Sequence, residues 1–404
     1  MAEVRSWEVY TDLSTVRLSH MSQDIRDFVS TQAQLVGLGE PSHAEPAFGW
    51  VRNELFAQLV ARGFRSFALE TDRVAALVVD DFVQGGEGTL DTVLRQGFTH
   101  GFGDRAPNRE LVGWMREYNR DRPAGERLAF HGFDAQTENT SAPSPRRYLE
   151  YARDYLGLDV DIAGIAGDDE WWSREEAILD AAKSPGTSVA ARRLRSVGAD
   201  LLGALHARAG ELIAATSRAA WVRAGTYLAA GLGLLRYHKR AAEPGEQGMR
   251  ITRLLAVRDG LMARNLLDIR DIEAERGPTL VHAHNGHLQK NPATLSIGEY
   301  EATWIGAGAI VNALLGESYA FVATTLGRSG GLELGDPAAG TYEALVQGQV
   351  DEWGLLATEA VAGGVRRADG AWSYEPLGPA TVLDADAIVH IADADVVRAE
   401  LGTA

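Results

Sequence analysis

The chain of 404 residues contains no cysteine, and this absence excludes several kinds of chemistry at once. Disulfides, thiolate metal ligands and a cysteine nucleophile all require a thiol. Lysine is scarce as well, with only Lys183, Lys239 and Lys290, and none of them follows a glycine. A Walker-type phosphate loop needs a Gly-Lys pair, so that class of nucleotide site is also excluded.

Basic residues are fewer than acidic ones, and the sequence has no long apolar run. There are 39 basic against 56 acidic residues, which gives a formal net charge of -17. Because such a surface repels phosphate backbones and anionic lipid, we expect a small-molecule partner, with no nucleic acid and no membrane. The longest weakly polar run, 227–235, is far shorter than the ~20 residues of a spanning helix. Residues 1–5 lack the order of a signal peptide, so a cytoplasmic location is expected.

Four short apolar runs have the length and the bounding residues of buried strands. They are residues 35–39, 66–69, 128–133 and 279–283. Helical patterns separate them, for example over 48–60, where apolar residues recur near the 3.6-residue period. Strands that are apolar almost throughout belong to a sheet covered on both faces. The sequence therefore predicts an α/β fold with a mostly parallel central sheet flanked by helices.

The pattern becomes almost wholly helical between about 144 and 276, which predicts a helical insertion or cap subdomain. We expect the first part of the α/β catalytic core at residues 1–150 and the helical cap at 151–245. The second part of the core is expected at 246–404. Two further strands are expected at 319–326 and 387–391, joined by Gly-rich loops.

Each of the four inner strands ends in ionisable residues. In chain order these are Glu40, then Glu70 and Asp72, then Asp134, then His284 and His287. Ligands of open α/β sheets bind beyond the carboxyl ends of the strands, so these side chains are predicted to converge on one cleft. Two alternatives apply to single members: Asp72 and Asp134 can also be N-caps, and His131, alone in an apolar strand, is expected in the core.

Histidine and carboxylate supply the proton-transfer chemistry that remains. Histidine titrates near neutral pH, so it can take a proton from water and return it. Glu40 and His43 are three residues apart on a strand-to-helix turn, where the carboxylate would orient the ring. Arg52, on the following helix, is expected to reach a carboxylate or a developing oxyanion. Alternation places His282 on the same strand face as His284.

Competing site types have weaker support in the sequence. A Gly-x-Ser-x-Gly match occurs at 327–331, but the residues after it are typical of a loop and not of the helix that a nucleophile elbow opens. We therefore expect a Gly-rich turn there. No Gly-x-Gly-x-x-Gly follows a strand, which argues against a dinucleotide site. His282, His284 and His287 with Glu40 and Glu70 leave a metal open as an alternative, but without a known ligand spacing we expect no metal and no cofactor.

These motifs, in this order, resemble the erythromycin esterase family, which includes proteins named for succinoglycan biosynthesis. The similar segments are 38–43, Arg52, 67–72, 114–119, 132–136, 258–265, 283–287 and 319–327. The resemblance covers nearly the whole chain. It implies hydrolysis of a macrolide lactone by an activated water in place of a covalent acyl-enzyme.

The resemblance also implies roles for individual residues. His43 would be the general base and Glu40 its orienting partner. The other catalytic positions that it implies are Arg52, Glu70, His284 and His287. The residues expected to bind substrate or to support these groups are Asp72, Asp134, Gln136, Asn285 and His282. The chain departs from the family at 44–47, where Glu45 is expected to add a carboxylate to the pocket rim.

Three functions remain open from the sequence. The first is a metal-independent hydrolase that opens a lactone or ester, as in macrolide resistance. The second uses the same cleft in natural-product biosynthesis, for cyclisation, acyl transfer or elimination, and is motivated by the altered segment 44–47. The third is a non-catalytic protein that binds a drug or haem-like ligand through its histidines.

Overall fold

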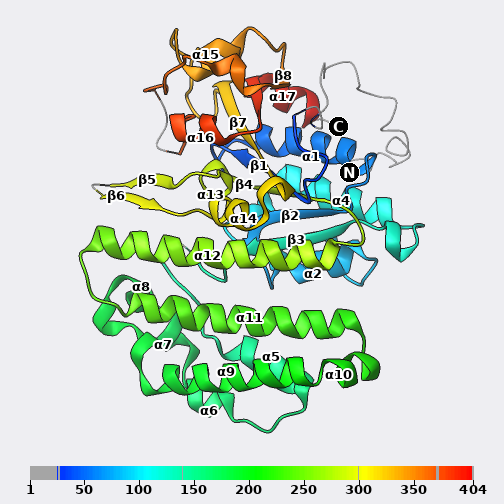
Figure 1. Ribbon diagram of the computed structural model, residues 1–404, viewed down its shortest axis with the longest axis vertical. Coiled ribbons are helices and arrows are strands. Elements are labelled where there is room, and N and C mark those ends of the chain that lie inside the picture. Colours follow the sequence, from blue (N-terminus) through cyan, green and yellow to red (C-terminus); the bar gives the residue numbers. More distant parts are fainter. Residues whose placement is uncertain (1–24, 26–27, 139, 299, 370–372, 403–404) are drawn as a thin grey trace, which may run out of the picture.

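A seven-stranded sheet forms the centre of the computed structural model, which describes residues 25, 28–138, 140–298, 300–369 and 373–402 (Figure 1). Its strands are β1 (Leu35–Glu40), β2 (Ser66–Asp72), β3 (Ala129–Asp134), β4 (Thr279–His284), β7 (Tyr319–Arg328), β8 (Trp353–Leu356) and β9 (Ala387–Asp393). The order across the sheet is β3-β2-β4-β1-β7-β9-β8. All neighbours run parallel except β8, which pairs antiparallel with β9. The predicted α/β fold is confirmed.

Two apolar cores cover the two faces of the sheet because successive strand residues point in opposite directions. One core takes Val36 and Leu38 of β1, and the other takes Leu35. Helices α1 (Pro46–Val60), α2 (Ala76–Val83), α3 (Leu90–Gly97), α4 (Ala106–Asn119) and α17 (Ala394–Leu401) pack in the first core. Helices α12 (Gln247–Glu273), α13 (Asn285–Leu288), α14 (Ala307–Leu315) and α15 (Tyr342–Gln347) pack in the second.

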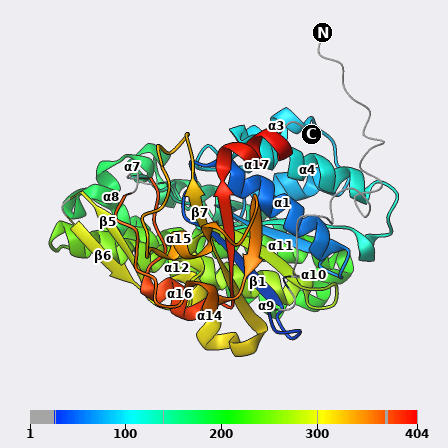
Figure 2. The same ribbon diagram turned by 90° about the horizontal axis from the view of Figure 1, so that it is seen from above.

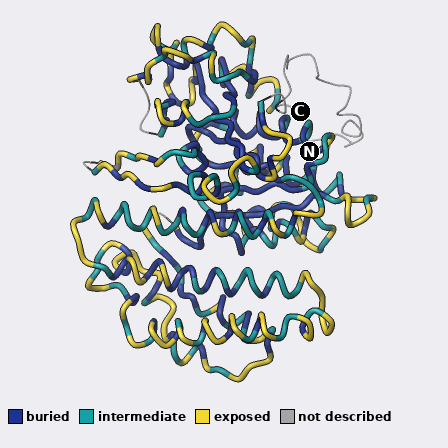
Figure 3. The backbone as a smooth tube through the Cα atoms, in the orientation of Figure 1, coloured by how far each residue is buried: buried dark blue, intermediate teal, exposed yellow. Residues whose placement is uncertain are grey.

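A separate helical layer lies beyond α12, which runs between it and the sheet (Figure 1). The layer comprises α5 (Arg146–Leu156), α6 (Ile162–Ala166), α7 (Asp169–Ser173), α8 (Glu176–Leu179), α9 (Val189–Ala207), α10 (Ala209–Ala215) and α11 (Arg218–Ala241). It has its own apolar core around Trp172, Leu201 and Leu228, and the burial pattern in Figure 3 follows these layers. The division of the chain into two core parts and a cap stays a prediction.

The segment after α13 is richer in strands than expected. The sequence predicted two strands there, and that number is wrong among the described residues: the hairpin β5 (Ala293–Ile297) and β6 (Tyr300–Trp304) and the edge strand β8 are additional. These strands have four or five residues, and β6 is partly exposed, so none forms a long apolar run. Figure 2 shows the hairpin projecting to one side and α16 (Pro379–Asp384) nearby.

Two expectations concern the chain outside the sheet. Residues 1–5, which lack the order of a signal peptide, lie outside the described residues. Among the described helices, none is long and apolar enough to cross a membrane.

The contact between α12 and the sheet offers a test of the fold. Leu266 of α12 is 0% exposed, whereas Leu383 is 80% exposed. We expect Leu266→Ala to lower the free energy of unfolding by about 2–5 kcal/mol, because it removes buried methyl groups and leaves a cavity. Leu383→Ala, the matched control, should stay within about 0.5 kcal/mol of the parent in urea unfolding. Equal losses in the two variants would contradict the placement of α12.

Candidate active site

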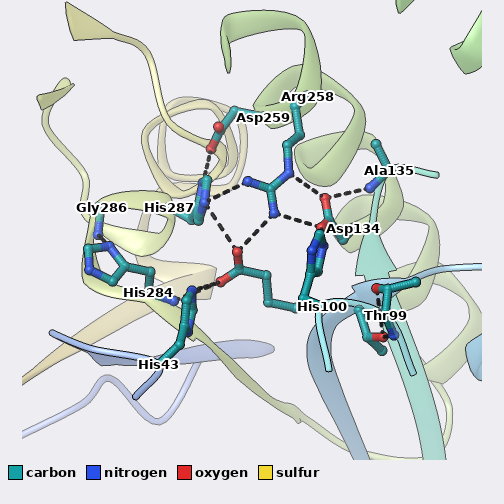
Figure 4. A network of polar contacts seen from close by, with 12 residues as sticks. His43, Thr99, His100, Asp134, Ala135, Arg258, Asp259, His284, Gly286 and His287 are labelled. Carbon is teal, nitrogen blue, oxygen red and sulfur yellow. Dashed lines mark hydrogen bonds and ion pairs between the residues drawn. The ribbon is translucent and has the colours of Figure 1, made fainter. Parts of the chain in front are cut away.

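The carboxyl ends of adjacent parallel strands meet at one edge of the sheet. Strand β4 is inserted between β2 and β1, and β3 lies beyond β2. In-register pairing places Glu40 opposite His284 and Leu69 opposite His282. This strand order brings together side chains that are far apart in the sequence (Figure 4).

His43 lies in the turn between β1 and α1, and its side chain is 33% exposed. Its Nδ1 is 2.7 Å from Glu40 Oε1. Because an ionised carboxylate only accepts, Nδ1 carries the proton, and the neutral ring keeps a lone pair on Nε2. That Nε2 lies 3.7 Å from Glu70 Oε2. The carbonyl oxygen of His43 accepts a hydrogen bond from Arg105.

Glu40 is buried and uses its two oxygens for two different histidines. Its Oε2 is 3.1 Å from His282 Nε2, while His282 Nδ1 donates to the Leu38 carbonyl oxygen at 2.9 Å. Both ring nitrogens of His282 face oxygen atoms, so one proton lies between His282 Nε2 and Glu40 Oε2. The other oxygen of Glu40, Oε1, accepts the hydrogen bond of His43. Burial opposes ionisation, but His282 and then His43 hold the pKa of Glu40 well below its usual range.

Glu70 has both carboxylate oxygens occupied. Oε1 accepts from Arg258 Nη2 at 2.9 Å and lies 3.3 Å from His287 Nε2. Oε2 accepts the backbone N–H of His284 at 2.9 Å. Burial acts against the charge, but His287, His43 and Arg258 hold the pKa of Glu70 well below its usual range. Glu70 is therefore a fixed negative charge beside His43 and not a proton donor.

Arg258 of α12 links β2 to β3 through two buried carboxylates. Its Nε donates to Asp134 Oδ1 at 2.9 Å and its Nη2 to Asp134 Oδ2 at 2.7 Å, in the bidentate geometry that guanidinium favours. Burial opposes the charge of Asp134, but Arg258 and then His100 lower its pKa. The same guanidinium also contacts Glu70, so α12 and two strand ends are tied at one point.

His287 carries positive charge at this edge of the sheet. Its Nδ1 is 2.9 Å from Asp259 Oδ1, and Asp259 Oδ2 accepts from Trp304 Nε1 at 2.8 Å. Burial lowers the pKa of His287, but Asp259 and Glu70 outweigh it and raise that pKa to about 10. At neutral pH the ring is therefore an imidazolium between two carboxylates.

His284 has the opposite character. Burial, followed by the neighbouring imidazole rings of His43 and His287, lowers the pKa of His284 to about 4, so the ring is neutral at neutral pH. Its Nδ1 accepts the backbone N–H of Gly286 at 3.2 Å, at the start of α13. The single ring proton is consequently on Nε2, as a hydrogen-bond donor. The ring centre lies 5.6 Å from that of His43.

Arg52 does not make the contact expected of it. Within the described residues its hydrogen bonds go to Asn53 and Asn108, and its guanidinium lies 5.3 Å from the centre of the Phe67 ring. Burial lowers the pKa of Arg52 to about 10, while the negative charge of Glu40 opposes that shift. Arg52 thus interacts with Glu40 through its charge and not through a hydrogen bond, and its functional role stays a prediction.

The remaining predicted residues support the loops around the site. Asp72 Oδ1 accepts Gln136 Nε2 at 3.0 Å and the N–H of Val74 at 2.6 Å, and burial raises the pKa of Asp72. Asn285 donates from Nδ2 to the Thr324 carbonyl oxygen at 3.0 Å and accepts the Thr324 N–H at 3.3 Å. These contacts are with the polypeptide, so a direct role in binding substrate stays a prediction for all three.

Glu45 lies elsewhere than expected. It is 2% exposed, which makes its expected place on the pocket rim wrong. The residue before a helix can turn its side chain back onto the helix start, and Glu45 Oε1 accepts the Ala47 N–H at 3.1 Å as the N-cap of α1. Its Oε2 accepts the hydroxyl of Ser329 at 2.6 Å. Ser329 is buried in a turn closed by backbone hydrogen bonds with Leu334, so the Gly-x-Ser-x-Gly match is a turn, as predicted.

Four residues that contact the site are not predicted from the sequence: His100, Arg105, Arg258 and Asp259. His100 has a φ of 56°, donates toward Asp134 at 3.0 Å and lies 2.8 Å from Glu138 Oε2. A non-glycine residue at positive φ is uncommon and clusters at functional sites, but sequence does not reveal it. The segment 258–265 resembles a family motif, and this resemblance is the signal that points to Arg258 and Asp259.

Two further expectations concern histidine. His131 is buried, with Nε2 at 2.8 Å from Glu273, so its placement in the core is confirmed. Among the residues that the structure describes, no group of three or more histidine and acidic side chains is placed to hold a metal ion. Glu40 bonds both His43 and His282, and His287 lies between Asp259 and Glu70, whereas His284 bonds the backbone N–H of Gly286.

The protein is an α/β protein with a cluster of histidines and carboxylates at the carboxyl ends of its strands. Comparison with known proteins identifies its family. The profile of the erythromycin esterase family matches residues 60–377, so the chain belongs to that family. Glu70, Asp134, Arg258, His284 and His287 lie within the match, whereas the segment 40–52 precedes it. No match is found among curated proteins.

Solved structures share the fold at low sequence identity. A Bacillus cereus protein has a TM-score of 0.65 at 17% identity, over 91% of this chain and 90% of that chain. A succinoglycan biosynthesis protein has a TM-score of 0.63 at 17% identity, over 91% and 90%. A mutant of the erythromycin esterase EreC in its open conformation has a TM-score of 0.61 at 20% identity, over 90% and 91%. At such identities the likeness concerns the fold alone.

The charge of His287 makes a prediction about pH. Its pKa rises from 6.5 to about 10 on folding, so its stabilising contribution is complete below pH 6.5 and is lost as the pH rises toward 10. We expect His287→Gln to lower the free energy of unfolding near pH 6.5 by a few kcal/mol and to flatten its decline up to pH 10. Urea unfolding at several pH values measures this. Parallel pH curves for parent and variant would contradict it, and His206→Gln, at an exposed position, is the control.

Proposed function

We propose that the protein hydrolyses carboxylic esters, including lactones, with a water molecule activated by His43. The observation that carries this proposal is the hydrogen bond of 2.7 Å between His43 Nδ1 and Glu40, which leaves Nε2 as a free base at the most open part of the network. Membership of the erythromycin esterase family supports the reaction class, and the substrate it favours is a small molecule with an ester bond.

The attacking water would sit beside His43 Nε2 and Glu70 Oε2, which are 3.7 Å apart. A water there can donate one proton to each atom. His43 takes a proton as the water oxygen attacks the carbonyl carbon, and Glu40 stabilises the imidazolium that forms. Glu70 keeps its charge throughout, because Arg258 and His287 neutralise it from behind.

His284 would stabilise the carbonyl oxygen. As attack proceeds, negative charge gathers on that oxygen, and a preorganised N–H donor lowers the energy of this state. The ring of His284 is neutral at neutral pH and has its proton on Nε2. It can therefore donate a hydrogen bond to the oxygen without transferring the proton. When the tetrahedral intermediate collapses, the ester C–O bond breaks and the His43 imidazolium returns its proton to the leaving alkoxide.

The natural-product alternative stays open, although one part of its motive differs in the structure. It rested on an altered pocket rim at 44–47, but Glu45 points into the core toward Ser329. An oxygen-18 water experiment still separates the two chemistries. Hydrolysis places one labelled oxygen in the carboxylic acid product, whereas cyclisation or transfer to another alcohol does not. A panel of macrolides and simpler lactones, followed by product mass, would define the substrate class.

The role of His43 is tested by replacing it. We expect His43→Ala to lower kcat by at least ~10³-fold with a parent-like circular dichroism spectrum, because water loses its base while the buried network stays intact. Glu40→Gln should also lower kcat strongly. His206→Ala, which removes an exposed histidine on α9, is the matched control and should keep full activity. Full activity of His43→Ala would overturn the proposed mechanism.

The donor role of His284 has its own signature. We expect His284→Ala to lower kcat by about 10²–10³-fold with little change in KM, because the donor acts mainly in the transition state. His284→Gln should recover part of that loss, since its amide retains an N–H. Steady-state kinetics on the best substrate of the panel measure both variants. Equal kcat values for Gln and Ala would show that the N–H of His284 is not used.

A further inference from the structure

One buried polar cluster near the site has no part in the mechanism above. It joins Glu45, just before α1, to Ser329, after β7, and to Arg398 of α17. Glu45 Oε2 accepts the Ser329 hydroxyl at 2.6 Å, and Glu45 Oε1 lies 3.5 Å from Arg398 Nη1. Glu45 and Ser329 are 2% and 0% exposed. Burying a carboxylate is costly unless it is bonded, so these contacts determine where Glu45 can lie.

The direction of the hydrogen bonds within the cluster is determined by the structure. Ser329 Oγ accepts the N–H of Leu332 at 3.1 Å, so its own proton is left for Glu45. A hydroxyl that donates to a carboxylate at this distance makes a strong, charge-assisted bond. The serine turn is anchored in addition to α17, because the Gly330 N–H donates to Asp395 Oδ2 at 3.1 Å.

The cluster is two residues from His43. His43 and the exposed Ala44 form a short turn between two buried residues, Ser42 and Glu45. The upstream end of this turn is held by β1, and the Pro41 carbonyl oxygen accepts the N–H of Glu375 at 2.8 Å. The downstream end is held by Glu45. A turn this short has little freedom when both of its ends are fixed, so Glu45 constrains the place of His43 together with Arg105, which bonds the His43 carbonyl oxygen.

We propose that Glu45, Ser329 and Arg398, here called the Glu45 clamp, position the turn that carries His43 against Glu40. This proposal rests on the proposed function, in which His43 is the base. The clamp residues touch neither substrate nor reacting atoms, so they are positioning residues. The Ser329 hydroxyl acts as an anchor for the base and not as a nucleophile.

The test uses Ser329→Ala in the full-length protein, with Ser66→Ala as its matched control. Ser66 is also a serine of 0% exposure, but its hydroxyl bonds Thr279 at 2.7 Å at the opposite end of the strands. Each variant loses one buried hydroxyl, so a general loss of stability affects both. We expect kcat for the best ester substrate to fall about tenfold or more in Ser329→Ala with KM within about twofold, and to stay near parent in Ser66→Ala.

A second readout follows His43 itself, independently of turnover. The Nδ1–H proton of His43, shared with Glu40, gives an imidazole NMR signal that His43→Ala assigns by its loss. We expect this signal to shift or broaden in Ser329→Ala, while the His282 signal on the same carboxylate stays in place. Glu45→Gln keeps the helix cap but removes the charge facing Arg398, and should give a smaller change of the same kind.

The outcomes distinguish the clamp from the proposed function. An unchanged His43 signal in both clamp variants would overturn the clamp, whatever happens to kcat. A changed signal with parent-like kcat would overturn its importance for catalysis. If His43→Ala keeps full hydrolysis, the base assignment fails, and the His43 signal in Ser329→Ala still decides whether the clamp positions the turn.

Discussion

The buried negative charge of Glu70 is the constraint on which the rest of the site depends. A carboxylate that is 2% exposed stays ionised only if it is neutralised and fully hydrogen-bonded. Arg258 comes from α12, His287 from α13 and the backbone N–H of His284 from the end of β4. Each partner belongs to a different element, so three parts of the fold contact the same carboxylate at one edge of the sheet. The network in Figure 4 is the result.

This arrangement also explains why neighbouring histidines differ in character. His287 lies between two carboxylates and keeps its proton, with a pKa raised to about 10. His284 is buried and lies near the charged His287, so its pKa falls to about 4, and its Nδ1 accepts a backbone N–H. His43 bonds Glu40 at one nitrogen and exposes the other. The same side chain thus supplies a fixed cation, a neutral donor and a base, because the environment and not the residue type sets the charge.

The turn that carries His43 is held by contacts at both of its ends. The turn with His43 begins at a strand end in register with β4 and ends at a buried helix cap. Arg105, at the start of α4, donates a hydrogen bond to the carbonyl oxygen of His43. Contacts from the turn after β7, from the start of α4 and from α17 therefore meet at one short segment.

The sequence by itself determined the strands that carry the site, because buried parallel strands are apolar runs that end in polar residues, as at Glu40 and Glu70. It also placed Glu40 beside His43, since three residues on one turn lie close in any fold. Short strands such as β8 and the positive φ of His100 left no comparable signal. Only the tertiary structure decided that Arg258, 188 residues from Glu70 in sequence, neutralises it, and that Glu45 faces inward. Such pairings depend on sheet order and helix docking, which local patterns do not encode.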